Sequence, residues 1–304
     1  MIVFSAREFL DAYAPDRFPA MHPPTARAAF LVSPIGFSLA AESATDNRYM
    51  AMQEGANAAR ALAEHAELAA ALRTCLPTLV FPGDASTPDA VFPNNAFGTV
   101  PGKLIVGAMR HAVRRRETDR TDIRAFFADL LGYAIVDLST RDVCAELTGS
   151  LVIDHARRVG FCGLSERCDE AGARAMHEAF GLKLTYCFEL SPGEYHTNVV
   201  LAVLASRGIV IAPDGFAMAE TVDAIAHVYG HRVLRIGPAQ KAAFAGNAIT
   251  LSGDAVWMSE RAAASLSPSQ LKALSDWGFV LRSVSLAEIE KAGGSLRCCV
   301  GEIF

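Results

Sequence analysis

Two adjacent cysteines near the end of the chain have the residue type and the setting that suit covalent chemistry. Cys298 and Cys299 follow the glycine-rich turn 293–295 and precede three apolar residues, Val300, Ile303 and Phe304. A C-terminal segment without a structural or functional role is normally disordered, whereas an apolar segment can pack into a core. We therefore expect a buried, firmly held nucleophilic thiol at Cys298.

A cysteine nucleophile needs a base, because the thiolate is the reactive form and a free thiol is mostly protonated near neutral pH. Of the eight histidines, His196 stands out because it directly precedes an apolar run that starts at Val199. The alternative is a strand-terminal histidine that only makes local hydrogen bonds. Glu146, five residues before a predicted strand, could orient the imidazole, or it could be an ordinary exposed glutamate.

Three polar residues flank a short apolar stretch that contains a proline. Asp89 precedes Val91 and Phe92, and Asn94 and Asn95 follow. Such residues often serve turns. Two neighbouring amides beside phenylalanines could instead present donors and acceptors to a planar, amide-like ligand.

Three arginines are candidates for binding a carboxylate, which arginine can do with two parallel hydrogen bonds. Arg114 and Arg115 belong to a short charged run that follows a predicted strand, and Arg167 lies between a predicted strand and a helix. The alternative for all three is a solvated surface position. Their positions alone leave both interpretations open.

Composition narrows the class of protein. The 304 residues carry a net charge of -5 and no extended basic segment, which argues against a nucleic-acid or membrane partner and favours a small-molecule substrate. Seven cysteines without a CxxC pair argue against a disulfide framework and a zinc ribbon. No GxGxxG or GxxxxGK[ST] loop occurs, and no apolar run is long enough to span a membrane. We expect a cytoplasmic protein.

The elements that must position these residues alternate in an unusual order. Periodicity predicts helices near 47–72, 122–131, 170–180, 217–229, 269–277 and 286–291. Short strands are predicted at 78–81, 104–106, 151–153, 159–162, 184–188, 198–203, 208–211, 232–235, 248–251, 255–258 and 280–283. The recurring strand-strand-helix-strand pattern differs from a doubly wound sheet and predicts modular α/β repeats. No linker divides the chain, so we expect one domain over residues 1–304.

Taken in order, these segments resemble the guanidino-group-modifying enzymes: arginine deiminase, dimethylarginine dimethylaminohydrolase, arginine and succinylarginine dihydrolases, and amidinotransferases. The greatest similarity is to the arginine-deiminase-related, citrulline-utilisation hydrolase branch, over about residues 30–304. The matching motifs are Asp89 to Asn95, Arg114-Arg115, Glu146 to Ser150, Leu164 to Arg167, His196 to Asn198, Phe244 to Asn247 and Arg297-Cys298. The resemblance implies a five-bladed α/β propeller (pentein) of ββαβ units.

The resemblance also implies roles. Cys298 would be the nucleophile, His196 the general acid/base and Glu146 their acidic partner, with no metal or organic cofactor. The substrate site would be made by Asp89, Asn94, Asn95 and Asn247, with Arg114, Arg115 and Arg167 as candidates for the substrate carboxylate. The reaction implied is hydrolysis at the ureido or guanidino carbon of a citrulline- or arginine-like compound, with release of ammonia.

Several positions depart from the family pattern. Deiminases and methylarginine hydrolases have carboxylates where this chain has Asn94 and Asn95, and neutral amides favour a neutral ureido group over a cation. Gly36, Ala96 and Leu147 stand where the similar branch has asparagine, tryptophan and glycine. The missing asparagine removes one polar partner from the pocket, and Ala96 predicts a larger pocket that could admit a longer or N-substituted ligand.

Other functions remain open at this point. An amidinotransferase would use the same cysteine but pass the amidino group to an amine. A non-catalytic amino-acid sensor would keep the fold without needing a thiol. A papain-like protease is disfavoured, because there the cysteine precedes the histidine in the chain. Size and family favour a homodimer.

Overall fold

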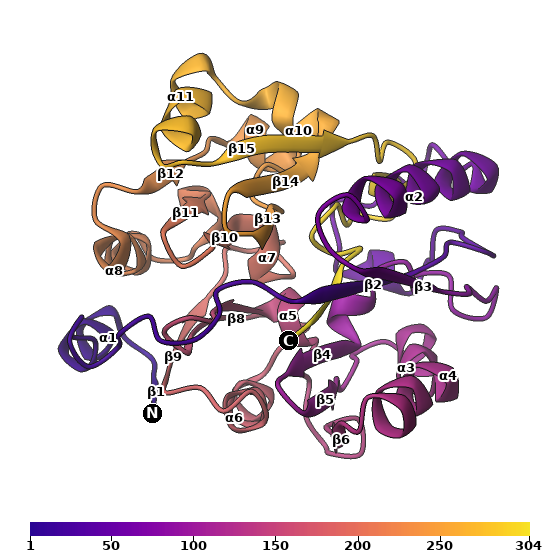
Figure 1. Cartoon of the computed structure of the whole chain (residues 1–304), viewed down its shortest axis with the longest axis horizontal. Helices are drawn as coiled ribbons and strands as arrows, with labels where there is room; N and C mark the ends of the chain where they lie inside the picture. Colours follow the sequence, from indigo (N-terminus) through magenta and orange to yellow (C-terminus); the bar gives the residue numbers. More distant parts are fainter.

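Five small β-sheets form the framework of the molecule (Figure 1). The computed structural model describes residues 1–304. One sheet contains β4 (Phe97–Val100), β5 (Lys103–Val106) and β6 (Ala134–Asp137), and the next contains β7 (Leu151–Asp154), β8 (Val159–Leu164), β9 (Leu184–Glu189) and β1 (Ile2–Val3). The other three contain β10 (Leu201–Leu204), β11 (Gly208–Ile211) and β12 (Val233–Arg235); β13 (Ile249–Ser252), β14 (Ala255–Ser259) and β15 (Val280–Val284); and β16 (Gly301–Ile303), β2 (Ala28–Val32) and β3 (Thr78–Phe81).

Every sheet repeats one pairing order. Its first strand is antiparallel to the second, and the second is parallel to the third. Parallel neighbours need a crossover, which helices supply. The crossovers contain α3 (Ala112–Thr118), α4 (Thr121–Ala125) and the π-helical turn η3 (Phe126–Leu130); α6 (Glu170–Ala179); α8 (Ala219–Tyr229); α10 (Glu260–Ser265) and α11 (Pro268–Asp276); and η1 (Ser43–Thr45) with α2 (Ala58–Leu72).

The sheets contact one another through their first strands. β16 contacts β4, and β10 contacts both β7 and β13. Both ends of the chain join sheets, because β1 pairs with β9 and β16 pairs with β2. The C-terminal residues are held as expected: Val300 and Ile303 are buried, and the Phe304 ring stacks on His155 with centroids 4.1 Å apart.

Local sequence explains why the helices begin where they do. Asp169 caps α6 by accepting a hydrogen bond from Gly172 N at 2.6 Å, and Asn57 caps α2 in the same way through Arg60 N. The prediction of a helix from residue 47 is therefore wrong at its start, since α2 begins at Ala58. Residues 47–57 form a loop that contains Gly55 at φ +65° and lies beside the C-terminal segment, where Met50 bridges to Ala292.

Other sequence-based predictions need smaller corrections. The strand predicted from residue 198 begins at Leu201, because residues 197–200 form the one-turn helix α7 (Thr197–Val200). The helix predicted at 286–291 is only the 3-10 turn η5 (Ile289–Lys291). The sequence patterns did not predict strands β1, β2, β4, β6 and β16 or the helices α1 (Ala6–Ala12), α3 and α10. They also missed the short turns η1, η2 (Pro93–Asn95), α5 (Leu147–Ser150), η4 (Pro213–Gly215) and α9 (Pro238–Ala242).

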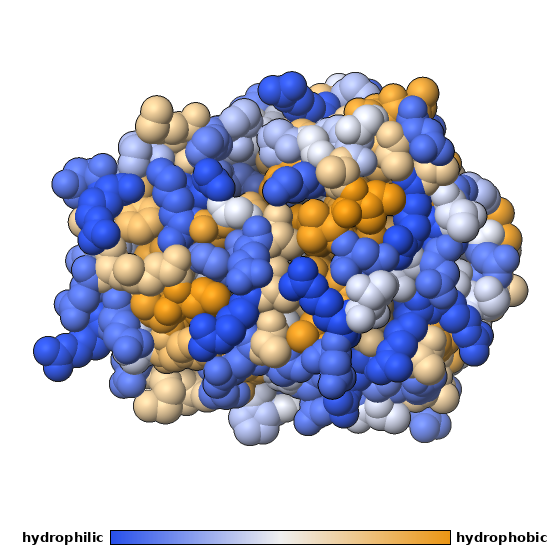
Figure 2. Space-filling view, turned by 90° about the horizontal axis from the view of Figure 1, so that it is seen from below, coloured by the Kyte–Doolittle hydropathy of each residue, from blue (hydrophilic) through white to orange (hydrophobic).

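The apolar side chains gather in the interior around the sheets. A cluster that includes Phe161, Tyr186 and Ile211 packs beneath α1 and α8, and a second one surrounds Leu68 and Trp257. On the face seen in Figure 2, hydrophobic residues form separate patches between hydrophilic ones. None of the helices combines the length and the apolar character needed to cross a membrane.

Candidate active site

A helical turn or tight bend precedes the first strand of each sheet, and each of these five turns carries one polar residue of the site. The five residues are Asn95, Glu146, His196, Asn247 and Cys298, which stand 51, 50, 51 and 51 positions apart. Asn95 ends η2, Glu146 precedes α5 and His196 precedes α7. In Figure 1, α5 and α7 lie near the centre of the molecule. The repeated unit therefore brings the same end of five different strands to one place.

The Cys298 thiol is buried and lies beside two amide groups. Asn247 Nδ2 lies 3.3 Å from Cys298 Sγ, and Asn198 Nδ2 lies 3.7 Å from it. Each amide is fixed in turn, since Asn247 Oδ1 accepts from Arg297 N at 3.0 Å and Asn198 Nδ2 also donates to Thr148 O at 3.1 Å. Burial raises the pKa of the Cys298 thiol, and the amide of Asn247 and the charge of Arg297 oppose that rise. The resting thiol is therefore protonated near neutral pH.

His196 and Glu146 form a completely buried pair. His196 Nε2 lies 2.9 Å from Glu146 Oε2. Burial raises the pKa of Glu146, but Arg167 and the His196 hydrogen bond outweigh it and hold that pKa well below its usual range. Burial lowers the pKa of His196, partly offset by Glu146. Near neutral pH the carboxylate is ionised and the imidazole is neutral, so Nε2–H donates to Glu146 and Nδ1 keeps its lone pair.

Two buried arginines support this pair, and protein carboxylates neutralise both. Arg167 Nη1 lies 3.2 Å from Glu146 Oε2, and its Nη2 donates to Asp46 Oδ1 at 2.5 Å. Arg114 makes a bidentate pair with Glu117, with distances of 2.9 and 2.8 Å, and its Nη1 lies 3.8 Å from Glu146. Burial also raises the pKa of Glu117 to about 7, and Asp46 lies within 3.9 Å of a further guanidinium, that of Arg110, so the charges of the cluster largely cancel.

Cys298 opens onto a cavity of about 280 Å³ that is rich in unused hydrogen-bond acceptors. Asp89 and Asn95 line it, and Asp89 Oδ1 and Asn95 Oδ1 are buried without a partner. The other Asp89 oxygen accepts from Ser43 Oγ at 2.5 Å, and burial raises the pKa of this carboxyl group. His196 Nδ1 is also buried and unpartnered. Buried polar groups are normally satisfied, so this site fits a ligand rich in N–H donors.

Gly149 allows these unpartnered atoms to come together. A Cβ at this position would lie 2.5 Å from Asn95 Oδ1 and 2.8 Å from His196 Nδ1, closer than real Cβ atoms approach. The glycine therefore places the free acceptor of Asn95 and the free nitrogen of His196 around one point. Any larger residue would push one of them away.

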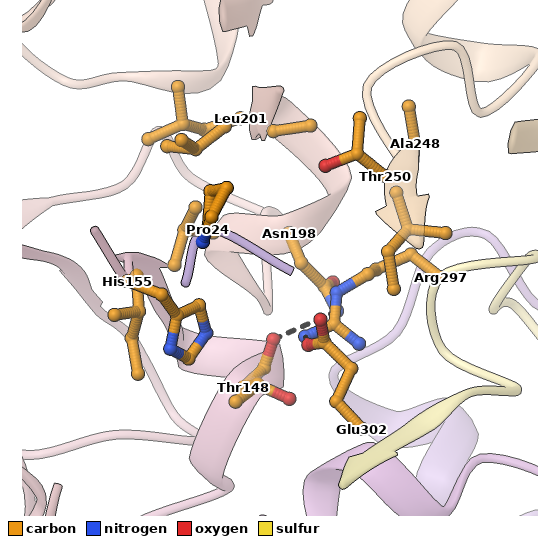
Figure 3. A pocket seen from close by; sticks show the side chains of 14 residues that line it. Pro24, Thr148, His155, Asn198, Leu201, Ala248, Thr250, Arg297 and Glu302 are labelled. Atoms are coloured by element: carbon orange, nitrogen blue, oxygen red, sulfur yellow. Dashed lines mark hydrogen bonds and ion pairs between the residues drawn. The ribbon is translucent and has the colours of Figure 1, made fainter. Parts of the chain in front are cut away.

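A second cavity, of about 490 Å³, lies on the other side of Asn198 (Figure 3). Thr148, Asn198, Arg297 and Glu302 surround it, and Arg297 Nη2 pairs with Glu302 Oε2 at 2.9 Å. Asn198 thus separates this cavity from the Cys298 thiol. No group of three or more His, Cys, Asp or Glu side chains in the structure is placed to hold a metal ion.

The structure brings most of the predicted site residues together, but not all of them line the pocket. Cys298, His196, Glu146, Asp89, Asn95, Arg114 and Arg167 form one cluster. Asn94 lies next to it, with its side-chain amide donating to Thr148 Oγ1 at 3.3 Å and its Oδ1 buried without a partner. Asn247, predicted to bind substrate, contacts the Cys298 sulfur instead.

Arg115 departs from its predicted place. It is exposed, and its guanidinium donates to the backbone oxygens of Met109 and Arg110 at 2.9 and 3.0 Å. Because α3 turns successive side chains through about 100°, Arg114 faces the site while Arg115 faces away. The sequence pair Arg114-Arg115 therefore contributes one buried arginine to the cluster.

The expectation that Ala96 enlarges the pocket is not supported by its position, and the two other departures do not line the cavity either. Ala96 and Leu147 are buried in apolar clusters and do not line the cavity at Cys298. Gly36 has φ +79°, and a Cβ there would lie 2.4 Å from Ala85 Cα. Glycine at this position follows from the local backbone.

Sequence reasoning missed the residues supplied by loop 43–57. Ser43, Asp46 and Asn47 contact or line the site. The helix predicted from residue 47 concealed Asn47 and the loop that follows, and no motif marked Ser43 or Asp46. Asn57 was the available signal, because it is a strong helix-capping residue directly before an alanine-rich run. Asn198 was noted only as part of a motif.

Three comparisons place the chain among known proteins. A family model described as "N,N dimethylarginine dimethylhydrolase, eukaryotic" matches residues 33–304. A search of curated protein sequences finds no match.

Solved structures share the fold at low sequence identity. The N-terminal domain of ArgZ, an arginine dihydrolase from the ornithine–ammonia cycle in cyanobacteria, was crystallised with substrate as a cysteine-to-serine mutant. It is 18% identical, with a TM-score of 0.78 over 91% of this chain and 97% of that chain. AgrE with ornithine and NAD+ is 19% identical, with a TM-score of 0.79 over 91% of this chain and 39% of that chain. A dimethylarginine dimethylaminohydrolase adduct is 19% identical, with a TM-score of 0.69 over 91% and 100% of the two chains.

These findings confirm the predicted superfamily and a mixed α/β fold. The matching model describes dimethylarginine hydrolases, one of the relatives named on sequence grounds. The match extends over most of the chain and includes every residue of the cluster around Cys298. The chain belongs to the N,N-dimethylarginine dimethylhydrolase family of guanidino-group-modifying enzymes, which are hydrolases acting on carbon–nitrogen bonds.

Proposed function

We propose that this protein hydrolyses a citrulline- or arginine-like substrate by attack of Cys298 on the ureido or guanidino carbon, through a covalent intermediate, with release of ammonia. The observation that carries the proposal is a set of buried, unpartnered acceptors: Asp89 Oδ1 and Asn95 Oδ1, which share the cavity with the thiol, and His196 Nδ1, which lies with Asn95 Oδ1 around Gly149. Ureido and guanidino groups are planar and offer several N–H donors, so they satisfy this set.

The first chemical step follows from the protonation states. His196 Nδ1 accepts the proton of the Cys298 thiol, and the sulfur forms a bond to the central carbon to give a tetrahedral intermediate. Glu146 stabilises the imidazolium through the 2.9 Å hydrogen bond to Nε2. The imidazolium then protonates the leaving nitrogen, the carbon–nitrogen bond breaks, and ammonia departs. A thiouronium or thiocarbamate on Cys298 remains.

The second step regenerates the enzyme. Neutral His196 removes a proton from water, whose oxygen attacks the same carbon, and the carbon–sulfur bond breaks with return of the proton to the thiol. From a thiouronium adduct of arginine this gives citrulline. From a thiocarbamate adduct of citrulline it gives a carbamate, which breaks down to ornithine and carbon dioxide. A crystal structure of an ArgZ variant holds a covalently bound reaction intermediate, which supports this course by similarity.

Charge supports an enzyme that accepts both kinds of group. Neutral Asn95 lacks the charge-assisted hydrogen bonds that a cationic guanidinium prefers, and so favours a ureido group. Asp89 has an unpartnered carboxylate oxygen in the same pocket, which favours a cation. We therefore propose a dihydrolase-type reaction, in which citrulline formed from arginine is hydrolysed again.

Methylated arginines are a second candidate substrate. The observation that favours them is the match to the dimethylarginine hydrolase model over residues 33–304. The same residues would act in the same order, with methylamine or dimethylamine as the leaving group.

We further propose that the five sheets are the blades of a five-bladed α/β propeller formed by the whole chain. The identical pairing order of the sheets and the spacing of 50 or 51 residues between site residues support this proposal. The sharing of one sheet by β2 and β16 also supports it, since that pairing would close the ring. The homodimer expected from size remains a prediction.

Product analysis tests the proposed function. Purified protein would be incubated with citrulline, arginine, monomethylarginine, dimethylarginine and agmatine, and ammonia, methylamines and amino acids would be measured. Ornithine from both citrulline and arginine is the expected result. Citrulline accumulating from arginine would restrict the enzyme to deimination, and dimethylamine release alone would favour the second candidate. Turnover of none of them would contradict the proposal.

A further inference from the structure

The first strand of each sheet is called its inner strand below. The pocket at Cys298 lies at the start of the inner strands, and a large surface pocket lies at their other end. Asn95, Gly149 and Cys298 precede β4, β7 and β16, whereas Val100, Ile153 and Phe304 lie at or near the far ends of the same strands and line the surface pocket. Four residues of strand span about 13 Å, which separates the two sites. The surface pocket, counted with the solvent space at its mouth, has a volume of about 1170 Å³. In Figure 1, its borders at α6, β4 and the C-terminus lie close together.

All titratable side chains that line this pocket are basic. They are His22, Arg27, Lys103, His155 and Arg158, and no aspartate or glutamate is among the lining residues. This is unusual in a chain with 33 acidic and 28 basic residues. His155 does not add charge near neutral pH, because burial and the nearby Arg297 lower its pKa to about 3.

The three permanent cations have no carboxylate partner. Arg27, Lys103 and Arg158 take part in no ion pair of the structure, although 24 such pairs occur elsewhere. Arg158 donates only to the backbone oxygen of Gly181. The one anionic group at the pocket is the carboxylate of the C-terminal residue Phe304, which accepts a hydrogen bond from the Tyr133 hydroxyl and pairs with none of the three cations. Three cations against one carboxylate leave a net positive charge and unused donors for an anion that enters the pocket.

The floor between the cations is apolar and partly aromatic. Phe180 and Phe304 line it together with Val100, Ile153 and Leu182. The Phe304 ring is held in place by its stacking on His155. Such a surface buries a flat apolar body, and the surrounding cations fix a charged group at its edge.

We propose that this pocket binds a small organic anion in which a phosphate or carboxylate group is attached to a flat apolar body. The binding site is separate from the catalytic cluster and does not depend on the function proposed for Cys298. Arg27 and Lys103 hold the anionic group, and Phe180 and Phe304 contact the apolar body.

Calorimetric titration of the full chain tests this proposal with four probes: 1-naphthyl phosphate, 1-naphthoate, neutral 1-naphthol and inorganic phosphate. We expect at least one naphthyl anion to bind about tenfold or more tightly than both naphthol and inorganic phosphate, since neither of these has both features. The better of the two anions identifies phosphate or carboxylate as the preferred group. Equal affinity for naphthol and both anions would overturn the proposal.

Charge-removal variants locate the binding. Both Arg27 and Lys103 are exposed, so the double variant Arg27→Gln/Lys103→Gln should fold, which thermal unfolding would verify. It should weaken binding of the naphthyl anion about tenfold, whereas Lys272→Gln, which removes a cation paired with Asp276 on α11, should change it less than about twofold. Unchanged binding of the naphthyl anion in the double variant would overturn the proposal, and so would displacement of the naphthyl anion by citrulline. A protein that is a dimer and dissociates in the double variant would also overturn it, because the pocket would then be a contact between subunits.

Discussion

The sites at the two ends of the inner strands differ in how their charged groups are paired and in which hydrogen-bonding atoms are left unused. At the catalytic end, Arg114 and Arg167 are buried and matched to carboxylates, and the atoms left without partners are acceptors. At the other end, Arg27 and Lys103 are exposed and unmatched, and the unused atoms are donors. Ligand preference therefore depends on which groups remain after internal pairing.

Removing the nucleophile should separate the two sites most sharply. Cys298→Ser should lower kcat by about 10⁴-fold or more, because a serine hydroxyl in this setting is not activated to attack. Binding of 1-naphthyl phosphate should stay unchanged. Turnover by steady-state ammonia release and calorimetry would measure both effects.

The neighbouring cysteine provides the matched control. Cys299 is equally buried but packs in the apolar cluster around Leu296 and Val300, so Cys299→Ser should keep most of the activity. A Cys299→Ser protein without activity beside an active Cys298→Ser protein would reverse the assignment of the nucleophile.

Neutralising the buried carboxylate should have the next largest effect. Glu146→Gln should lower kcat by about 10²- to 10³-fold, because the imidazolium loses its charged partner. Wild-type kcat/KM should fall with acid below pH 6.5, where His196 becomes protonated, since burial lowers its pKa from 6.5. Glu146 raises the pKa of His196, so the variant should move this limb to lower pH. An unmoved acid limb would contradict the pairing of these residues.

Adding a negative charge to the pocket at Cys298 should change its preference between arginine and citrulline, by a smaller factor than the effects above. Asn95→Asp places a carboxylate beside the unpartnered Asp89 oxygen, and we expect the ratio of kcat/KM for arginine to that for citrulline to rise about tenfold. Asn94→Asp is the control, because Asn94 does not line the cavity and should shift the ratio less. Equal shifts in both variants would indicate a general field effect in place of direct contact.

The smallest effect should come from an amide that contacts the sulfur. Burial raises the pKa of Cys298 above 9, so its alkylation by iodoacetamide should accelerate as pH rises through that region. Asn247→Ala removes the donor at 3.3 Å and should move the profile to higher pH, with a rate several-fold lower at fixed pH. An unchanged profile would mean that Asn247 positions the chain without stabilising the thiolate.

The fold was more readable from sequence than the contacts of the site. Helix α6 has a clear start signal in its cap Asp169, α8 is a periodic segment that ends at its C-cap, Gly230, and strands β7, β8 and β9 show compact apolar runs, so these were predicted close to their real bounds. Strands β4 and β16 were missed because they are only three or four residues long and contain glycine. The strand conformation of β16 also depends on a distant partner, Phe30 on β2.

The identities of the site residues followed from ordered motifs, but their contacts did not. Nothing local to Arg167 reveals that Asp46, 121 residues away in sequence, takes its guanidinium. The regular spacing of Asn95, Glu146, His196, Asn247 and Cys298 was a signal that could have been used. It places one polar residue at the same point of each repeat, which predicts that Asn247 lies with the catalytic residues.

The central claim is that Cys298 carries the covalent intermediate. The most direct measurement is mass spectrometry of the protein quenched with acid during turnover of citrulline or arginine, followed by mapping of the modified peptide. We predict a substrate-derived mass increase on Cys298, absent from Cys298→Ser. An adduct on Cys299 or on any other residue, or continued turnover by Cys298→Ser, would contradict the account.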